Sequence, residues 1–192
     1  MPSYMAAGYG EQIHQTDPHL IEEAMILRIG REDDVHALIE LYEATERAVY
    51  AYILSVIPNP EIAADLVQET YLYVRRSAHL YVLTGKPLAW ILGIARKLTK
   101  DYLRIHKHNP LRIYSDASFG GIASETDRII LAHALSLLRT AERQVLFLHA
   151  AAGLRHREIA SCLSIPISAV RIHYMRSVDK LRKRLYEQGV SL

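Results

Sequence analysis

Residues 158–171 read EIASCLSIPISAVR, and this stretch decides the fold of the C-terminal part of the chain. Its pattern is typical of a helix, a tight turn and a second helix. Ala160 is small where two helices must cross closely, and Ile165 can fill the turn. Ser168 is placed to cap the second helix. The stretch therefore predicts a helix–turn–helix.

The second helix of this motif is predicted to continue to about Tyr186, with Val170, Tyr174 and Leu181 on its inner side. Its outer side offers, in order, Arg171, Ile172, Met175, Arg176, Lys180, Arg182, Lys183 and Arg184. Base-reading side chains early and phosphate-binding cations later are typical of a recognition helix in the major groove. An ordinary helical hairpin with a basic tail is the alternative.

A second basic helix is predicted from Pro87 to about Lys107. A buried stripe at helical spacing is formed by Leu88, Ile91, Leu92, Ala95, Leu98 and Tyr102. Another face carries Trp90, Gly93, Lys97, Lys100, Arg104 and Lys107. Four cations in line behind an aromatic ring can follow a phosphate backbone while the ring stacks on an exposed base. A solvated basic face with Trp90 half in the core is the alternative.

A third informative helix is predicted at about residues 61–78, where Asn59 can serve as the cap and Pro60 as the first helical residue. One polar-edged side of this helix carries Asp65, Gln68, Glu69 and Leu72. This side could meet a basic protein surface. Read without the other segments, the pattern favours a solvated face over a binding surface.

The whole chain is predicted to be all-α, with two small helical domains joined by a flexible linker. We divide it into an N-terminal tail at 1–30, a helical domain at 31–108, a linker at 109–127 and a helix–turn–helix domain at 128–192. The tail is expected to be largely unstructured or to fold only against something else, because its composition is mixed and its periodicity weak. The linker contains Pro110, Gly120 and Gly121.

The composition excludes several classes of protein. Half of the 192 residues are apolar, and the single cysteine, Cys162, excludes an intramolecular disulfide or a multi-cysteine zinc site. Neither a signal peptide nor a membrane span is recognisable, so we expect a cytoplasmic protein. The net charge runs from −7 over residues 1–57 to +3 over 58–128 and +6 over 129–192. The basic C-terminal third suits a polyanion.

Together these segments resemble the extracytoplasmic-function (ECF) class of bacterial RNA polymerase sigma factors, from about Asp33 to Leu185. The resemblance is carried by Asp65-Leu66-Val67-Gln68-Glu69-Thr70-Tyr71, Ala89-Trp90-Ile91-Leu92-Gly93-Ile94-Ala95-Arg96, Asp101-Tyr102-Leu103-Arg104, Glu142-Arg143-Gln144-Val145-Leu146-Phe147-Leu148 and the helix–turn–helix. It implies a protein that binds core RNA polymerase and directs promoter recognition, DNA melting and transcription initiation.

The resemblance also implies roles for particular residues. The clamp helices of the polymerase's largest subunit would meet Asp65, Gln68, Glu69 and Leu72. The connection Leu80–Lys86 would hold a flipped non-template base. The opened strand of the minus-ten region would contact Trp90, Lys97, Lys100, Arg104 and Lys107. The minus-thirty-five element would be read by Ser168, Arg171, Ile172, His173, Met175 and Arg176. The flap of the second-largest subunit and an anti-sigma factor are further implied partners, and the linker would run toward the active cleft.

Several residues depart from the family pattern. Lys97 stands where the family usually has Asn, Arg139 replaces a common Pro, and Ser164 replaces a common Gly. Ile172-His173 occupies a pair that is often Ser-Arg, so relatives do not predict the upstream sequence that this chain reads.

Two other functions compete with this interpretation. A helix–turn–helix regulator that binds DNA without polymerase would share the C-terminal motif, and a helical interaction module would share the basic stripe. An enzyme is disfavoured, because the ten histidines form no close metal pattern and no phosphate loop or nucleophile elbow is present. We expect no cofactor and no metal.

Overall fold

The computed structural model describes residues 18–106 and 133–187, and every regular element in these two ranges is helical. The all-α prediction is confirmed. The N-terminal range contains α1 (Pro18–Glu32), α2 (Val35–Val56), α3 (Pro60–Ser77), the short 3-10 helix η1 (Ala78–Leu80) and α4 (Pro87–His106). The C-terminal range contains α6 (Thr140–Ala150), α7 (His156–Leu163) and α8 (Ile167–Glu187), preceded by a helical turn at residues 133–136. The predicted linker at 109–127 lies outside the described residues.

Local signals place the ends of the N-terminal helices. The Asn59 side chain accepts a hydrogen bond from the Ile62 N–H at 3.0 Å, and Pro60 occupies the first turn of α3. Asp34 caps α2 in the same way through the Ala37 N–H at 3.0 Å. α4 begins at Pro87. Each cap satisfies a backbone donor that the helix leaves unpaired, and the predicted starts of α3 and α4 are confirmed.

The prediction of an unstructured tail through residue 30 is wrong for residues 18–30, which belong to α1. Ile26 and Ile29 of this helix are buried in the main hydrophobic core. Their side chains cover apolar surface on α2 and on neighbouring helices, and this packing stabilises a helix whose own amphipathic pattern is weak. Residues 1–17 lie outside the described part of the chain.

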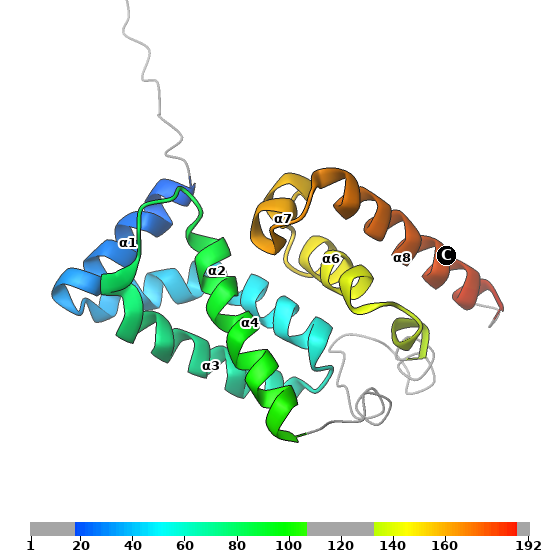
Figure 1. Ribbon diagram of the computed structural model, residues 1–192, viewed down its shortest axis with the longest axis horizontal. Helices are drawn as coiled ribbons and strands as arrows, with labels where there is room; N and C mark the ends of the chain where they lie inside the picture. Colours follow the sequence, from blue (N-terminus) through cyan, green and yellow to red (C-terminus); the bar gives the residue numbers. More distant parts are fainter. Residues whose placement is uncertain (1–17, 107–132, 188–192) are drawn as a thin grey trace, which may run out of the picture.

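α2 lies between two groups of helices, as Figure 1 shows. It packs against α1, α3 and α4 and, on another side, against α6. Its C-terminal half is therefore buried nearly all round, including Val49, Tyr52, Ile53 and Ser55. A helix that is apolar on every side is one that is covered on every side. The N-terminal half differs, because Val35 and Ile39 are about half exposed there while Ala37 and Leu41 are buried.

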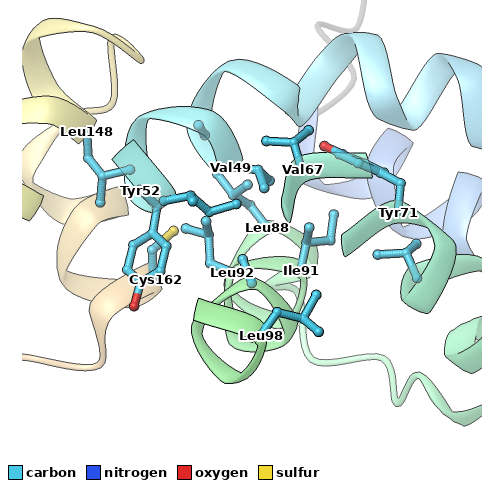
Figure 2. Packing of buried hydrophobic residues seen from close by; sticks show 14 of the residues in the cluster. Val49, Tyr52, Val67, Tyr71, Leu88, Ile91, Leu92, Leu98, Leu148 and Cys162 are labelled. Atoms are coloured by element: carbon cyan, nitrogen blue, oxygen red, sulfur yellow. The ribbon is translucent and has the colours of Figure 1, made fainter. Parts of the chain in front are cut away.

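The two predicted domains are in contact in this structure. Tyr52 of α2 and Leu92 of α4 lie beside Leu148 of α6 and Cys162 of α7 in one continuous hydrophobic cluster (Figure 2). A hydrogen bond of 3.0 Å joins the Arg143 Nε of α6 to the Ser55 backbone oxygen of α2. The apolar contact and this polar contact together hold the C-terminal helices against the N-terminal group.

Candidate nucleic-acid and protein interfaces

The outer face of α3 is a row of exposed side chains. Asp65, Gln68, Glu69 and Leu72 are all exposed, and Leu72 keeps 53% of its surface. The inner face of the same helix buries Leu66, Val67, Thr70, Tyr71 and Val74. Because residues three and four apart share one side of a helix, the four exposed residues form a single acidic and amide-bearing strip with an apolar edge. The structure brings these four predicted residues together.

The outer face of α4 carries the predicted cations. Lys97, Lys100 and Arg104 are exposed, and Arg104 also forms an ion pair of 3.1 Å with Asp101. Such a solvated pair holds Arg104 only weakly, so the guanidinium can exchange Asp101 for a phosphate. Lys107 lies outside the described residues.

Trp90 is less available than the three cations. Its side chain is half-buried, and its ring meets the Tyr81 ring edge-on, with centroids 5.1 Å apart and an interplanar angle of 66°. The Trp90 ring thus presents only part of its surface to solvent. Its contact with Tyr81 ties α4 to the segment that precedes it.

That segment is the η1–α4 loop, residues 81–86. Val82 and Leu83 in it are 71% and 62% exposed, and Leu80 just before it is 67% exposed. Three large apolar side chains so close together in solvent are typical of a binding surface rather than of a simple connection. Sequence reasoning missed the residue that holds this loop from behind, Glu23 of α1, whose Oε1 accepts hydrogen bonds from it.

The helix–turn–helix is confirmed in α7 and α8. The turn closes through hydrogen bonds from Ser164 N to Ser161 O at 3.3 Å and from Ile165 N to Ala160 O at 3.1 Å. Ser164 has a φ of 55°, in the left-handed region where glycine is unstrained. This conformation explains why glycine suits this position, and the serine here costs about 1 kcal/mol of strain.

One detail of the predicted motif is wrong. α8 begins at Ile167, so Ser168 lies within the first turn and not at the capping position. The first turn is instead closed by Ala169 N and Val170 N, which donate to the Pro166 backbone oxygen. Ser168 is exposed and stays on the outer surface.

α8 presents most of its surface to solvent. Its exposed residues include Arg171, Ile172, Met175 and Arg176, with Ile172 and Met175 at 47% and 63%. His173 differs, because its side chain is half-buried and its Nδ1 is buried with no hydrogen-bond partner in the described ranges. Of the six predicted side chains on this helix, His173 is thus turned furthest toward the protein.

A cluster of three rings lies where α8 packs against α6 and α7. His149 of α6, His156 of α7 and Tyr174 of α8 meet with ring centroids 4.8 to 5.1 Å apart. Burial lowers the pKa of His156, and the nearby charges of His149 and Arg171 lower it further. The cluster therefore favours a neutral His156 behind the exposed face of α8.

Cys162 is the small buried core residue that the sequence predicted. It is 6% exposed, and burial is the main cause that raises the pKa of its thiol to about 12. A thiol in that state carries almost no thiolate at neutral pH, so it is a poor nucleophile. In the described ranges no group of three or more His, Cys, Asp or Glu side chains is arranged to hold a metal ion, and none of the helices there could span a membrane.

Comparison with known families matches two parts of the chain. The model for Sigma-70 region 2 matches residues 41–108, and the model for Sigma-70, region 4 matches residues 128–181. The first match includes α3, the η1–α4 loop and α4, and the second includes the helix–turn–helix.

Individual relatives carry related names. The ECF RNA polymerase sigma factor SigK of Mycobacterium sp. strain KMS is 36% identical over 81 residues, which is 42% of this chain and 42% of that protein. SigK of Mycobacterium ulcerans is 26% identical over 179 residues, covering 81% of this chain and 96% of that protein. SigM of Bacillus subtilis is 27% identical over 161 residues, covering 79% and 96%. The match to the first relative thus spans less than half of its length.

Two solved structures share the fold. CnrH, in complex with the cytosolic domain of CnrY, superposes with a TM-score of 0.66 at 19% identity and covers 87% of this chain and 98% of its own. The sigma factor RpoE of Bartonella quintana, in complex with the anti-sigma factor NepR, gives a TM-score of 0.54 at 20% identity and covers 72% and 90%. The two family models and the named relatives together show that this chain belongs to the ECF class of the sigma-70 family of RNA polymerase sigma factors.

Proposed function

We propose that the protein is an alternative sigma factor, which binds core RNA polymerase in the cytoplasm and directs promoter recognition, melting and transcription initiation. The observation that carries this proposal is the exposure of three chemically different faces. The strip on α3 is acidic and amide-bearing, the row on α4 is cationic, and the outer face of α8 is cationic and apolar. The α3 strip suits a protein partner, the α4 row suits a single DNA strand, and the α8 face suits duplex DNA.

The α3 strip is the proposed polymerase-docking face. Asp65 and Glu69 supply negative charge, Gln68 supplies an amide, and Leu72 supplies an exposed apolar edge. This mixture suits the clamp helices of the largest polymerase subunit, provided that the facing surface is basic. A contact between the C-terminal domain and the flap of the second-largest subunit belongs to the same proposal.

The α4 row and the η1–α4 loop are the proposed minus-ten surface. Lys97, Lys100 and Arg104 can follow the phosphates of an opened strand. Because Trp90 packs edge-on against Tyr81, base capture falls to the loop, where Val82 and Leu83 are exposed. The loop would hold an unstacked base against these apolar side chains.

α8 is the proposed minus-thirty-five reader. Arg171, Ile172, Met175 and Arg176 are exposed in its first half, where a recognition helix contacts base edges. Ser168 is exposed one turn earlier, and His173 would contribute less, since it faces the protein.

The contact between the two domains implies a change of shape on binding. Elements centred about 25 base pairs apart lie about 85 Å apart on B-DNA, which rises about 3.4 Å per pair. A compact body of this size has a radius of gyration of about 15 Å, so domains joined through α2, α6, α4 and α7 are too small to span both elements together. The proposed function therefore includes separation of the domains when core polymerase binds.

Charge reversal on α3 tests the proposal most directly. The double variant Asp65→Lys/Glu69→Lys should lose core-polymerase binding while keeping its fold, because both side chains are exposed. A matched control is Glu32→Lys/Glu43→Lys, which reverses two exposed carboxylates outside α3. Binding is measured by co-purification with core enzyme and by run-off transcription. Normal binding by the α3 variant would show that the docking assignment is wrong.

A DNA-binding regulator that needs no polymerase is the second candidate, and the exposed face of α8 favours it equally. The two candidates differ in the free chain. A sigma factor of this class should bind promoters weakly without core enzyme, whereas a regulator should bind one sequence tightly. Gel-shift measurements with and without core polymerase separate them.

An anti-sigma partner is also part of the proposal. The solved structures of CnrH and RpoE contain the cytosolic domain of CnrY and the anti-sigma factor NepR, respectively. The acidic N-terminal third of this chain is a surface that a partner of opposite charge could meet.

A further inference from the structure

One oxygen of Glu23 accepts three hydrogen bonds from a segment about 60 residues further along the chain. The Tyr81 hydroxyl donates to Glu23 Oε1 at 2.6 Å, the Gly85 N–H at 2.8 Å and the Thr84 N–H at 3.1 Å. The three donors lie at the beginning, the middle and near the end of the η1–α4 loop. A single oxygen atom of one α1 side chain thus binds three positions along the loop.

Two of the four residues in this contact, Glu23 and Tyr81, are shielded from water, whereas Thr84 and Gly85 are exposed. Glu23 is 7% exposed and Tyr81 is 8% exposed. A buried carboxylate that lost its donors would be left in a poorly hydrated site, which is costly. The hydrogen bond to Glu23, after burial itself, is a cause of the raised pKa of the Tyr81 hydroxyl. The loop conformation is therefore strongly favoured over others in which these donors face solvent.

The position of Glu23 is itself determined by packing. Gly30, two turns later in α1, lies so close to η1 that a Cβ there would be 2.8 Å from the backbone of Ala78 and His79. α1 consequently has little freedom to slide along η1. At the other end of the contact, Gly85 has a φ of 67°, which allows the turn that points its N–H at Glu23.

The anchoring acts on one side of the loop and leaves the other side free. The backbone and Tyr81 are held from within, while the side chains of Val82 and Leu83 point into solvent. Apolar side chains in solvent have no packing of their own to order them, so their arrangement depends on the backbone beneath. Tyr81 also contacts the Trp90 ring, which links the same anchor to α4.

We infer that Glu23 is a positioning residue for base selection: it holds the η1–α4 loop in the shape that accepts one particular unstacked base. This inference rests on the proposed function, in which the loop captures a base of the minus-ten element. Glu23 does not touch DNA in this scheme. It acts through Tyr81 and the backbone of Thr84 and Gly85.

The test measures base discrimination in transcription by the full chain with core polymerase. Glu23→Leu removes the acceptor at similar size, whereas Glu23→Gln keeps a carbonyl acceptor without the charge. Templates carry every single-base change through the minus-ten and minus-thirty-five elements, each in fully paired form and in a form already mismatched at minus ten. The readout is the ratio of transcript from the preferred template to transcript from each changed one.

Glu23→Leu should lower discrimination at one minus-ten position by about three- to tenfold, the effect of losing hydrogen bonds that hold a contact in place. The loss should persist on the mismatched template, where melting is not needed. Glu23→Gln should recover most of the discrimination. Glu32→Gln, which changes an exposed carboxylate on the same helix, should behave like the unmodified chain. Core binding and minus-thirty-five discrimination should stay unchanged in all three variants.

Two results of the transcription assay would overturn the inference. Unchanged minus-ten discrimination in Glu23→Leu would show that the anchor does not affect base selection. An equal loss in core binding, minus-ten and minus-thirty-five discrimination would show that Glu23 serves only folding. Amide hydrogen exchange gives a check that needs no polymerase, because Glu23→Leu should speed exchange at Thr84 and Gly85, and unchanged rates would contradict the anchoring.

A loop variant separates this inference from the proposed function. Val82→Ala/Leu83→Ala alters the exposed side chains and leaves the backbone anchor in place. If this variant keeps full minus-ten discrimination, the loop does not read the promoter, and the proposed minus-ten surface is wrong together with the inference. If it loses discrimination and Glu23→Leu does not, only the inference fails.

Discussion

The N-terminal helical group of this chain and the last helix of its C-terminal group, α8, are stabilised in different ways. The N-terminal group encloses Ile26, Ile53, Ile91 and Leu92 at or near complete burial, so apolar packing holds it. In the C-terminal group, α8 buries only Val170 and Ser177 along 21 residues. That helix depends more on polar contacts, on the ring cluster and on the neighbouring α6 and α7. From this difference we expect the proposed minus-ten surface to lie on the more rigid scaffold.

The largest expected effect tests the apolar side of this comparison. Ile91→Ala in α4 should lower the free energy of unfolding by about 2–5 kcal/mol, because a fully buried side chain is removed and a cavity remains. Ile39→Ala, at a half-exposed position of α2, should cost less than about 0.5 kcal/mol. Urea unfolding followed by circular dichroism measures both. Similar losses at the two positions would contradict the proposed role of the core.

The next largest effect tests the polar contacts that hold α8. Lys180 Nζ of α8 lies 2.7 Å from Oε2 of Glu142, whose side chain is 2% exposed. Lys180→Met leaves that buried carboxylate with fewer donors and should cost about 1–3 kcal/mol. Lys183→Met, at an exposed position of the same helix, is the control. If Lys180→Met lowered the free energy of unfolding by less than the control does, the ion pair would not be a source of stability.

The pH dependence of this pair has a definite sign. Burial tends to raise the pKa of Glu142, but the hydrogen bond from Lys180, the Arg139 N–H and the nearby positive charges lower it overall. A carboxyl with a lowered folded-state pKa stabilises the fold above its unfolded-state pKa, and this stabilisation is lost as the pH falls through the folded-state value. Lys180→Met should therefore show less acid sensitivity than the unmodified chain.

A smaller effect is expected at the contact between the groups. Arg143→Ala removes the hydrogen bond to the Ser55 oxygen and should weaken docking of the domains by about 1 kcal/mol. Fluorescent labels at cysteines replacing Arg76 and Arg182 would report a larger mean separation. The labelled chain also carries Cys162→Ala, because Cys162 lies at the domain contact that the variant loosens. Arg157→Ala, an exposed arginine of α7, should leave the separation unchanged. Equal separations in both variants would show that the Arg143–Ser55 hydrogen bond does not contribute to the docking of the domains.

The smallest effect concerns mild acid. The folded-state pKa of His156 is lowered by burial and by the charges of His149 and Arg171, so the unfolded chain binds more protons as the pH falls below about 6.5. The C-terminal group should become less stable between pH 7.5 and 5.5, while the N-terminal group changes little. His156→Gln should flatten this dependence. Thermal unfolding followed by tryptophan fluorescence for α4 and by amide exchange for α8 separates the two groups.

Much of the fold could be predicted because its signals are local. Asn59 and Pro60 mark the start of α3, and Pro87 marks the start of α4, since capping and proline geometry involve only the nearest residues. The exposed faces of α3, α4 and α8 also followed from helical spacing. α1 was missed, although Asp17-Pro18 in the sequence is a recognisable helix start and Met25, Ile26 and Ile29 follow at helical spacing.

The sequence by itself thus determined the helices, their outer faces and the helix–turn–helix, because each depends on residues within one or two turns of one another. Only the tertiary structure showed that α2 is covered on two sides, and that Glu23 holds a loop 58 to 62 residues away. Among ten acidic residues in the first 57, nothing local distinguishes Glu23. Its role arises when Gly30 lets α1 approach η1 closely and brings one carboxylate against the loop donors. Such a contact depends on how helices pack, which no short-range pattern encodes.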